Sequence, residues 1–339
     1  MSAMENAMSE NETVAGVLER RRARRRFLVA AGQTGAVVGG LAVLAACGGG
    51  DGDSGGGSTP TPTPTTTPTP TAVTDTLNFA LNLEYLEAQF YSFAAFGTGL
   101  AATSLTGTGA QGTVTGGRKV AFTDPVVAQF AREIAYDEAA HVDFLRSALG
   151  GLAIAQPAIN IDGGAGGAFT AAATAAGLPL TNGGFDPYAS DENFLLAAYL
   201  FEDVGVTAYK GAAPALAASS AVYLVGAGIL AAEAYHAGLI RSTLYRKGLA
   251  TPTLRSGADA ISDARDRLDG TGDIDQGISG TGFGPTAVAN VVPADPNGIA
   301  YSRTAGQVLN IVYLNNAATN RGGFFPVGVN GSVNTSVAN

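Results

Sequence analysis

The chain has 339 residues, of which 28 are acidic and 19 are basic, giving a net charge of −9 at neutral pH. This acidic balance argues against nucleic acid as a partner, because affinity for phosphate backbones depends on clustered Lys and Arg. A single cysteine excludes an intramolecular disulfide and gives little support to thiol chemistry.

The first 46 residues are expected to be an export signal. Residues 24–28, Arg-Arg-Arg-Phe-Leu, fit the twin-arginine pattern, and a weakly apolar, glycine-containing stretch follows. Leu44–Cys47 then resembles a bacterial lipobox, in which the cysteine becomes the lipid-bearing first residue of the mature protein. The alternative is a transmembrane anchor, but that would need about 20 strongly apolar residues. We therefore expect residues 1–46 to be removed and Cys47 to anchor the protein in the periplasm or cell envelope.

Residues 47–74 are expected to be a tether. A Gly/Ser/Asp-rich part is followed by Thr-Pro repeats, so the first part should be flexible and the second extended. Residues 1–46 carry six of the basic and four of the acidic residues, which leaves a net charge of −11 on the remainder. That charge is compatible with attraction of metal cations.

Four segments show helical periodicity: residues 75–97, 123–150, 190–211 and 219–248. The second begins with Asp124 as a cap and Pro125 at the first helical position. The fourth ends at Gly248 after two basic residues, which are typical stop signals. About 40 residues separate the second helix from the third. This long connection predicts an all-α four-helix bundle with one crossover, spanning residues 75–248.

Residues 249–339 are rich in Gly, Asp, Asn and Pro, and we expect an irregular C-terminal extension that packs on the bundle. Only residues 307–314 are solidly apolar, and they fit a helix or a strand. Aspartates between Asp266 and Asp275 suggest calcium, but Ile274 occupies the place of the glycine that an EF-hand requires.

The only two histidines stand in matching contexts. Residues 138–149, EAAHVDFLRSAL, match residues 233–244, EAYHAGLIRSTL, in the motif Glu-x-x-His and in a following Arg-Ser-x-Leu. The helix before each motif carries a Glu and, seven residues later, a Tyr: Glu84 and Tyr91, then Glu202 and Tyr209. The chain therefore contains two copies of one helix pair.

Residue spacing turns this repeat into a prediction of a metal site. Residues three and four apart share a helix face, so Glu138 and His141 lie on one stripe with Ile134 and Leu145. Carboxylates that converge in a core repel one another and are costly to bury, and two divalent cations would offset four of them. The predicted ligands are Glu84, Glu138, His141, Glu202, Glu233 and His236.

Some assignments stay open at this point. Glu87 lies one turn from Glu84 and rivals it, although the matched spacing to tyrosine favours Glu84. Arg146 and Arg241 either pair with acids behind the ligands or lie on the surface. Carboxylates and imidazoles accept iron, manganese or zinc, so the ligand set does not select the metal.

With these residues in place, residues 75–248 resemble the ferritin-like di-iron carboxylate superfamily. The tail, from ISDARDRLDG to GGFFPVGVNG, is similar to that of desiccation-related ferritin-like proteins. The resemblance implies single-carboxylate ligands at Glu84 and Glu202, and bridging carboxylates at Glu138 and Glu233. It also implies one metal on each of His141 and His236, with Tyr91 and Tyr209 beside the metals or active in redox chemistry.

The resemblance implies two divalent ions, iron or manganese with zinc as a third option, and two classes of function. One is a di-metal oxidoreductase, ferroxidase-like or manganese-catalase-like, that reacts with oxygen or peroxide. The alternative is a non-enzymatic desiccation- or stress-protective envelope lipoprotein with a structural metal site. We expect a monomer or small oligomer, because an anchor, a tether and a long tail would obstruct a closed cage.

Overall fold

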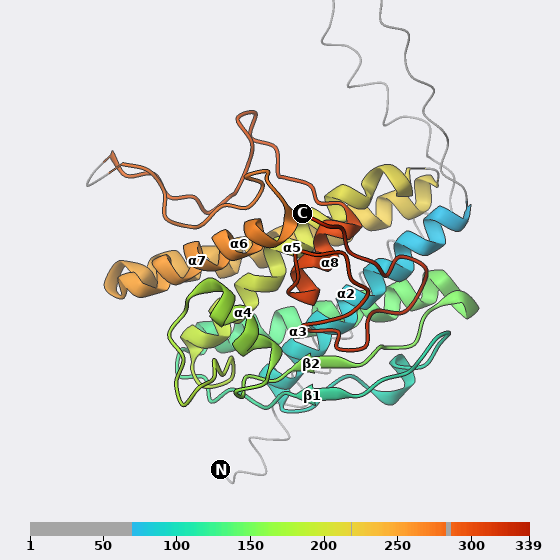
Figure 1. Cartoon of the computed structure of the whole chain (residues 1–339), viewed down its shortest axis with the longest axis horizontal. Helices are drawn as coiled ribbons and strands as arrows, with labels where there is room; N and C mark the ends of the chain where they lie inside the picture. The colour runs from blue at the N-terminus through green and yellow to red at the C-terminus, as the bar shows by residue number, and fades with distance from the viewer. Residues whose placement is uncertain (1–69, 218, 283–285) are drawn as a thin grey trace, which may run out of the picture. The chain divides into compact units, whose positions relative to one another are not determined.

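The computed structural model describes residues 70–217, 219–282 and 286–339, so the expected signal peptide and Cys47 lie outside the described residues. Four long helices form the core (Figure 1): α2 (Pro70–Phe96), α3 (Pro125–Leu149), α5 (Asp191–Leu216) and α6 (Ser220–Ala250). They correspond to the four predicted segments, with α2 beginning five residues earlier than expected. The predicted all-α class is confirmed.

Side-chain caps explain where three of these helices begin. Asp124 accepts hydrogen bonds from two backbone N–H groups of the first turn of α3, and Pro125 occupies the first helical position. Ser190 and Ser219 cap α5 and α6 in the same way. Each cap satisfies N–H groups that have no partner within the helix.

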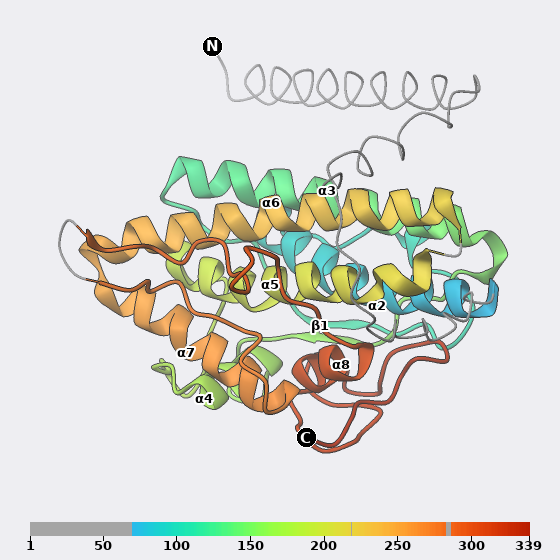
Figure 2. The same ribbon diagram turned by 90° about the horizontal axis from the view of Figure 1, so that it is seen from above.

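The four helices are arranged as two hairpins. Helix α2 packs on α3 and α5 packs on α6, and the hairpins meet through α2 against α5 and α3 against α6. Figure 2 shows α3 and α6 running side by side. Helix α6 is long and apolar enough to cross a membrane, but its Glu233, His236 and Arg241 are buried in the protein. That pattern is typical of a central bundle helix.

The connections carry short elements: η1 (Ala102–Ser104) and β1 (Val114–Gly116) between α2 and α3, then η2 (Gly150–Leu152), β2 (Ile159–Ile161) and α4 (Ala168–Ala176) between α3 and α5. Strand β1 pairs in parallel with β2, with Val114 opposite Ile159. The pairing joins the first connection to the long crossover.

The C-terminal extension is more regular than expected, because it contains α7 (Pro252–Asp269) and α8 (Ala305–Tyr313). Helix α8 is the apolar run, and a capping box of Thr304 and Gln307 begins it. Helix α7 gave no clear apolar stripe in the sequence because much of its buried face is small or polar: Gly257, Ala258, Ser262, Arg265 and Asp269.

A buried ion network ties this extension to the bundle. Its members are Arg241, Arg265, Arg303, Asp203, Asp269 and Asp275. Asp203 on α5 accepts hydrogen bonds from Arg241 (2.6 Å) and Arg265 (2.8 Å), and Arg303 donates to Asp269 (2.6 Å). Two aspartates of the calcium-like run therefore serve as partners of arginines.

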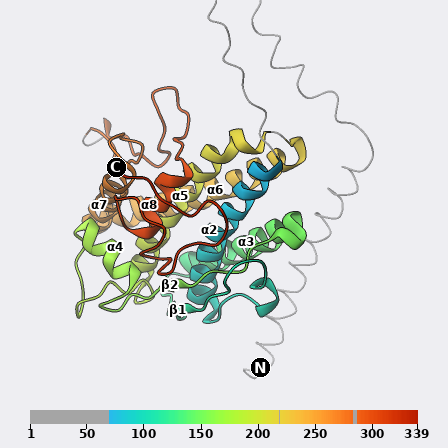
Figure 3. The same cartoon turned by 45° about the vertical axis from the view of Figure 1, so that its right-hand side comes forward.

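The last residues lie against the first helix of the bundle, as Figures 1 and 3 show for the segment after α8. The Asn82 side chain on α2 donates to the Asn330 carbonyl (2.9 Å) and accepts from the Asn330 N–H (3.0 Å). Phe324 packs edge-on against Phe201 of α5. Residues more than 200 positions apart thus share one core.

Candidate metal centre

The four bundle helices bring all six predicted ligands together: Glu84 from α2, Glu138 and His141 from α3, Glu202 from α5, Glu233 and His236 from α6. The four carboxylates are buried, and so is His236. The His141 side chain is the most exposed of the six, at 13%. The helix pairs therefore place the duplicated motif at the centre of the bundle.

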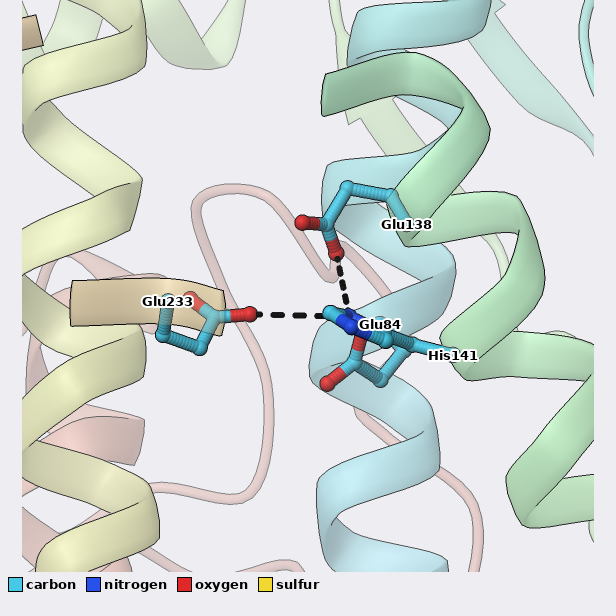
Figure 4. A group of neighbouring side chains, drawn as sticks. All are labelled: Glu84, Glu138, His141 and Glu233. Carbon is cyan, nitrogen blue, oxygen red and sulfur yellow. Dashed lines mark hydrogen bonds and ion pairs between the residues drawn. The ribbon is translucent and has the colours of Figure 1, made fainter. Parts of the chain in front are cut away.

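One half of the centre surrounds His141 (Figure 4). Its Nδ1 lies 3.1 Å from Glu84 Oε2, 3.4 Å from Glu138 Oε2 and 3.8 Å from Glu233 Oε1. These side chains come from three helices and point toward one another, so a single ion could contact an atom of each.

The other half surrounds His236. Its Nδ1 lies 3.0 Å from Glu138 Oε1 and 3.6 Å from Glu202 Oε2, and its Nε2 lies 3.4 Å from Asp137 Oδ2. Glu138 therefore directs one oxygen toward each histidine, as a bridging carboxylate would. The ring centroids of His141 and His236 are 6.3 Å apart.

The two tyrosines bind carboxylates of the opposite hairpin. The Tyr91 hydroxyl on α2 donates to Glu202 Oε1 on α5, and the Tyr209 hydroxyl on α5 donates to Glu84 Oε1 on α2. Burial and then the adjacent carboxylates raise the pKa of both phenols well above the ordinary value, so both stay protonated and donate. Each phenol holds one carboxylate oxygen, while the other oxygen faces a histidine.

Glu87 adds a fifth buried carboxylate. The sequence presented Glu84 and Glu87 as rivals, but both point into the centre because residues three apart share a helix face. Oxygens of Glu87, Glu202 and Glu233 lie close enough together to contact one ion. The choice between the two residues was therefore unnecessary, and Glu87 is an additional member of the cluster.

Electrostatics show how protons stabilise the cluster without metal. Burial, which His141 partly opposes, raises the pKa of Glu84 to about 7. Burial and neighbouring carboxylates raise the pKa of Glu87 and Glu233 well above the ordinary value. Burial alone would lower the pKa of His141, but Glu84 and Glu138 raise it to about 12. Protons thus take the place of positive ions in the metal-free chain.

Several atoms of the cluster are buried without a hydrogen bond. Within the described part of the chain these are Glu87 Oε2, both Glu138 oxygens, Glu202 Oε2, Glu233 Oε2 and His236 Nδ1. Buried polar atoms nearly always have a partner, and a set of carboxylate oxygens with an imidazole nitrogen is a suitable donor set for iron, manganese or zinc. The residues therefore fit a pair of metal ions.

The repeated arginines lie behind the ligands. Arg146 donates to the Tyr85 hydroxyl (2.6 Å) and Arg241 donates to Asp203 (2.6 Å). Tyr85 and Asp203 are the residues that follow Glu84 and Glu202, so each arginine secures the helix beside a ligand. Arg241 is fully buried, whereas Arg146 also binds loop carbonyls near the surface.

A family comparison agrees with this geometry. The model of the ferritin-like domain matches residues 72–246, just over half of the chain and all four bundle helices. The chain belongs to the ferritin-like family. Together with the buried cluster, membership identifies a di-metal carboxylate protein.

Two curated relatives have informative names. The ferritin-like protein is 39% identical to the desiccation-related protein PCC13-62 of Craterostigma plantagineum over 159 residues, 47% of this chain and 48% of that protein. It is 31% identical to the ferritin-like catalase Nec2 of Nesocodon mauritianus over 269 residues, 76% of this chain and 84% of that protein. The chain thus spans about half of the first relative and most of the second. No solved structure matches it.

Proposed function

We propose that this ferritin-like protein binds two manganese or iron ions and removes hydrogen peroxide. The observation that carries the proposal is the buried cluster of five glutamates and two histidines, in which several carboxylate oxygens and His236 Nδ1 have no hydrogen-bond partner within the described residues. Similarity to a protein named as a catalase, over 76% of this chain, supports peroxide as the substrate.

The reaction converts two molecules of hydrogen peroxide into two of water and one of dioxygen. A redox-active metal pair, when bound, supplies the two-electron oxidation and reduction. The chain positions the ligands: Tyr91 and Tyr209 hold the outer oxygens of Glu202 and Glu84. Burial of the cluster keeps bulk water and large substrates away, and the partly exposed edge of His141 marks the side nearest to solvent.

The second candidate is a non-enzymatic protective protein in which the metals stabilise the bundle, and the similarity to a desiccation-related protein favours it. For either role we propose that the chain is exported, and that Cys47 attaches it to the cell envelope through the segment that precedes α2.

One experiment separates the two candidates. The full-length protein is loaded with Mn²⁺, its metal content is measured by elemental analysis, and dioxygen release from peroxide is followed with an electrode. Peroxide removal predicts about two equivalents of metal and dioxygen release that stops on chelation. Two bound equivalents without dioxygen release would support the structural role, and a metal content well below one equivalent would contradict both.

Single histidine variants test the ligand assignment. His141→Ala and His236→Ala should each lose about one of the two metal equivalents, because each ring faces a different group of carboxylates. Asp143→Ala is the control, since Asp143 is exposed and accepts a hydrogen bond from Ser104. Equal metal loss from all three proteins would show that the ligands are wrongly assigned.

A further inference from the structure

The two halves of the metal centre follow one repeat, but the repeat is broken twice. Residues of α2 match residues of α5 at the spacing set by Glu84 and Glu202, so the partner of Glu87 is Gly205. Residues of α3 match residues of α6 at the spacing set by Glu138 and Glu233, so the partner of Asp137 is Ala232. In both cases a carboxylate stands in one half without an equivalent in the other.

The first break is built into the packing. A Cβ atom at Gly205 would lie 2.1 Å from Glu233 Oε2, which is far inside contact distance, and 3.6 Å from Glu87 Oε1. No side chain fits at position 205 while Glu233 keeps this conformation. The space that a second glutamate would need is thus occupied by the Glu233 carboxylate, and Glu87 remains unmatched.

The unmatched Glu87 lies beside Glu202, a carboxylate of the His236 half, and beside Glu233. One oxygen of Glu87 lies near oxygens of Glu202 and Glu233, and Oε2 is buried without a hydrogen bond within the described residues. Glu202 Oε1 accepts a hydrogen bond from the Tyr91 hydroxyl. Its other oxygen, Oε2, lies 3.6 Å from His236 Nδ1 and is therefore the one available to an ion beside that ring. Glu87 shares Glu202 with the group formed by Glu138, Glu202 and His236, and can therefore supply a further carboxylate next to Glu202.

The second break affects the same half. Asp137 lies 3.4 Å from His236 Nε2, on the side of the ring opposite the cluster. A carboxylate on the outer nitrogen fixes the ring and makes the inner nitrogen a stronger ligand. The three carboxylates that approach His141 do so at Nδ1, and Ala232 offers that ring no equivalent of Asp137.

We infer that the two metal positions are inequivalent, with Glu87 as a seventh ligand and Asp137 as a positioning residue that together make the His236 position the tighter one. The inference rests on the proposed metal binding. An additional negative ligand and a more basic imidazole both increase attraction for a cation, so the His236 position fills first.

The test is a titration of the metal-free, full-length protein with Mn²⁺, followed by calorimetry, with bound ions counted by native mass spectrometry. The natural protein should show two steps, the first at least about tenfold tighter, a ratio that corresponds to 1.4 kcal/mol. His236→Ala should remove the tight step and His141→Ala the weak step. Glu87→Gln, which keeps the side-chain shape, should weaken only the tight step, by about tenfold or more.

Asp137→Asn provides an independent variant, because Asp137 is 28% exposed and its replacement should leave the core intact. It should also weaken only the tight step, while the surface control Asp143→Asn changes neither. Two equal steps that Glu87→Gln leaves unchanged would overturn this inference but not the proposed function. Three bound ions, of which Glu87→Gln removes one, would also overturn it, since Glu87 would then hold a separate ion. A natural protein that binds no Mn²⁺ would overturn both this inference and the proposed function.

Discussion

Asp203→Ala should lower the free energy of unfolding by about 3–5 kcal/mol, because it leaves the buried Arg241 without its carboxylate partner and removes one of the two carboxylates that pair with Arg265. The Asp203 carboxylate accepts hydrogen bonds from Arg241 and Arg265, and both arginine side chains are 1% exposed. Asp275 pairs with Arg265 and Arg303 in the same network, but no ion pair joins it to Arg241 in the described residues. Urea denaturation of the metal-free protein, followed by circular dichroism, measures the loss.

The matched control is Glu192→Ala on the same helix. Glu192 pairs with Lys247 at 3.0 Å, but the two side chains are 38% and 21% exposed. Exposed pairs contribute about 1 kcal/mol or less. Equal losses in the two variants would mean that the buried network does not stabilise the fold. Because Asp203 follows Glu202, its loss should also weaken metal binding at the His236 position.

Chelation should lower the melting temperature more at pH 8 than at pH 5. The folded-state pKa of Glu84 is about 7, above its ordinary value of 4.5, so its stabilising protonation is complete below pH 4.5 and disappears as the pH rises through 7. The pKa of His141 is about 12 against an ordinary 6.5, so its contribution is complete below pH 6.5 and declines above that pH. The metal-free protein therefore loses stability between pH 5 and pH 8.

Metal acts in the opposite direction over this range, because it binds ionised carboxylates and neutral imidazoles. Two ions at about 100 times their dissociation constants would add roughly 5 kcal/mol, or about 10 °C in melting temperature, at pH 8. At pH 5 protons compete for the same atoms and the shift should be less than half as large. Thermal unfolding with and without chelator measures both shifts, and His141→Ala, with one ligand fewer, should show a smaller shift at pH 8. A larger effect of chelation at pH 5 would contradict a buried carboxylate cluster.

The sequence predicted the bundle and the six clustered residues because both depend on short spacings. Glu138 and His141 are three residues apart, and the second copy of the motif repeats the same spacing. Helix α7 was missed because its buried face includes Ser262, Arg265 and Asp269, whose burial depends on distant partners such as Asp203 and Arg303. No local sequence pattern predicts these long-range pairs between α7 and distant residues.

The centre itself shows the same limit. Spacing placed Glu87 on the ligand face but could not show that Gly205 leaves it unmatched, because that requires the packing between α2, α5 and α6. No local pattern in the sequence marks Asp137, and only the docking of α3 on α6 brings it to His236. The order of elements along the chain did not reveal that the tyrosines bind across the hairpins.

The crossed tyrosine bonds can form only after both hairpins have been synthesised. The partner of Tyr91 is Glu202, which follows it by 111 residues, and the partner of Glu84 is Tyr209, 125 residues further along the chain. When the first hairpin emerges from the ribosome, Tyr91 and Glu84 lack their partners, because Glu202 and Tyr209 have not yet been synthesised. The full ligand set exists only after α6 has been synthesised and the two hairpins have docked. Under the proposed function, metal loading therefore requires completed synthesis, because a truncated or undocked chain lacks part of the ligand set.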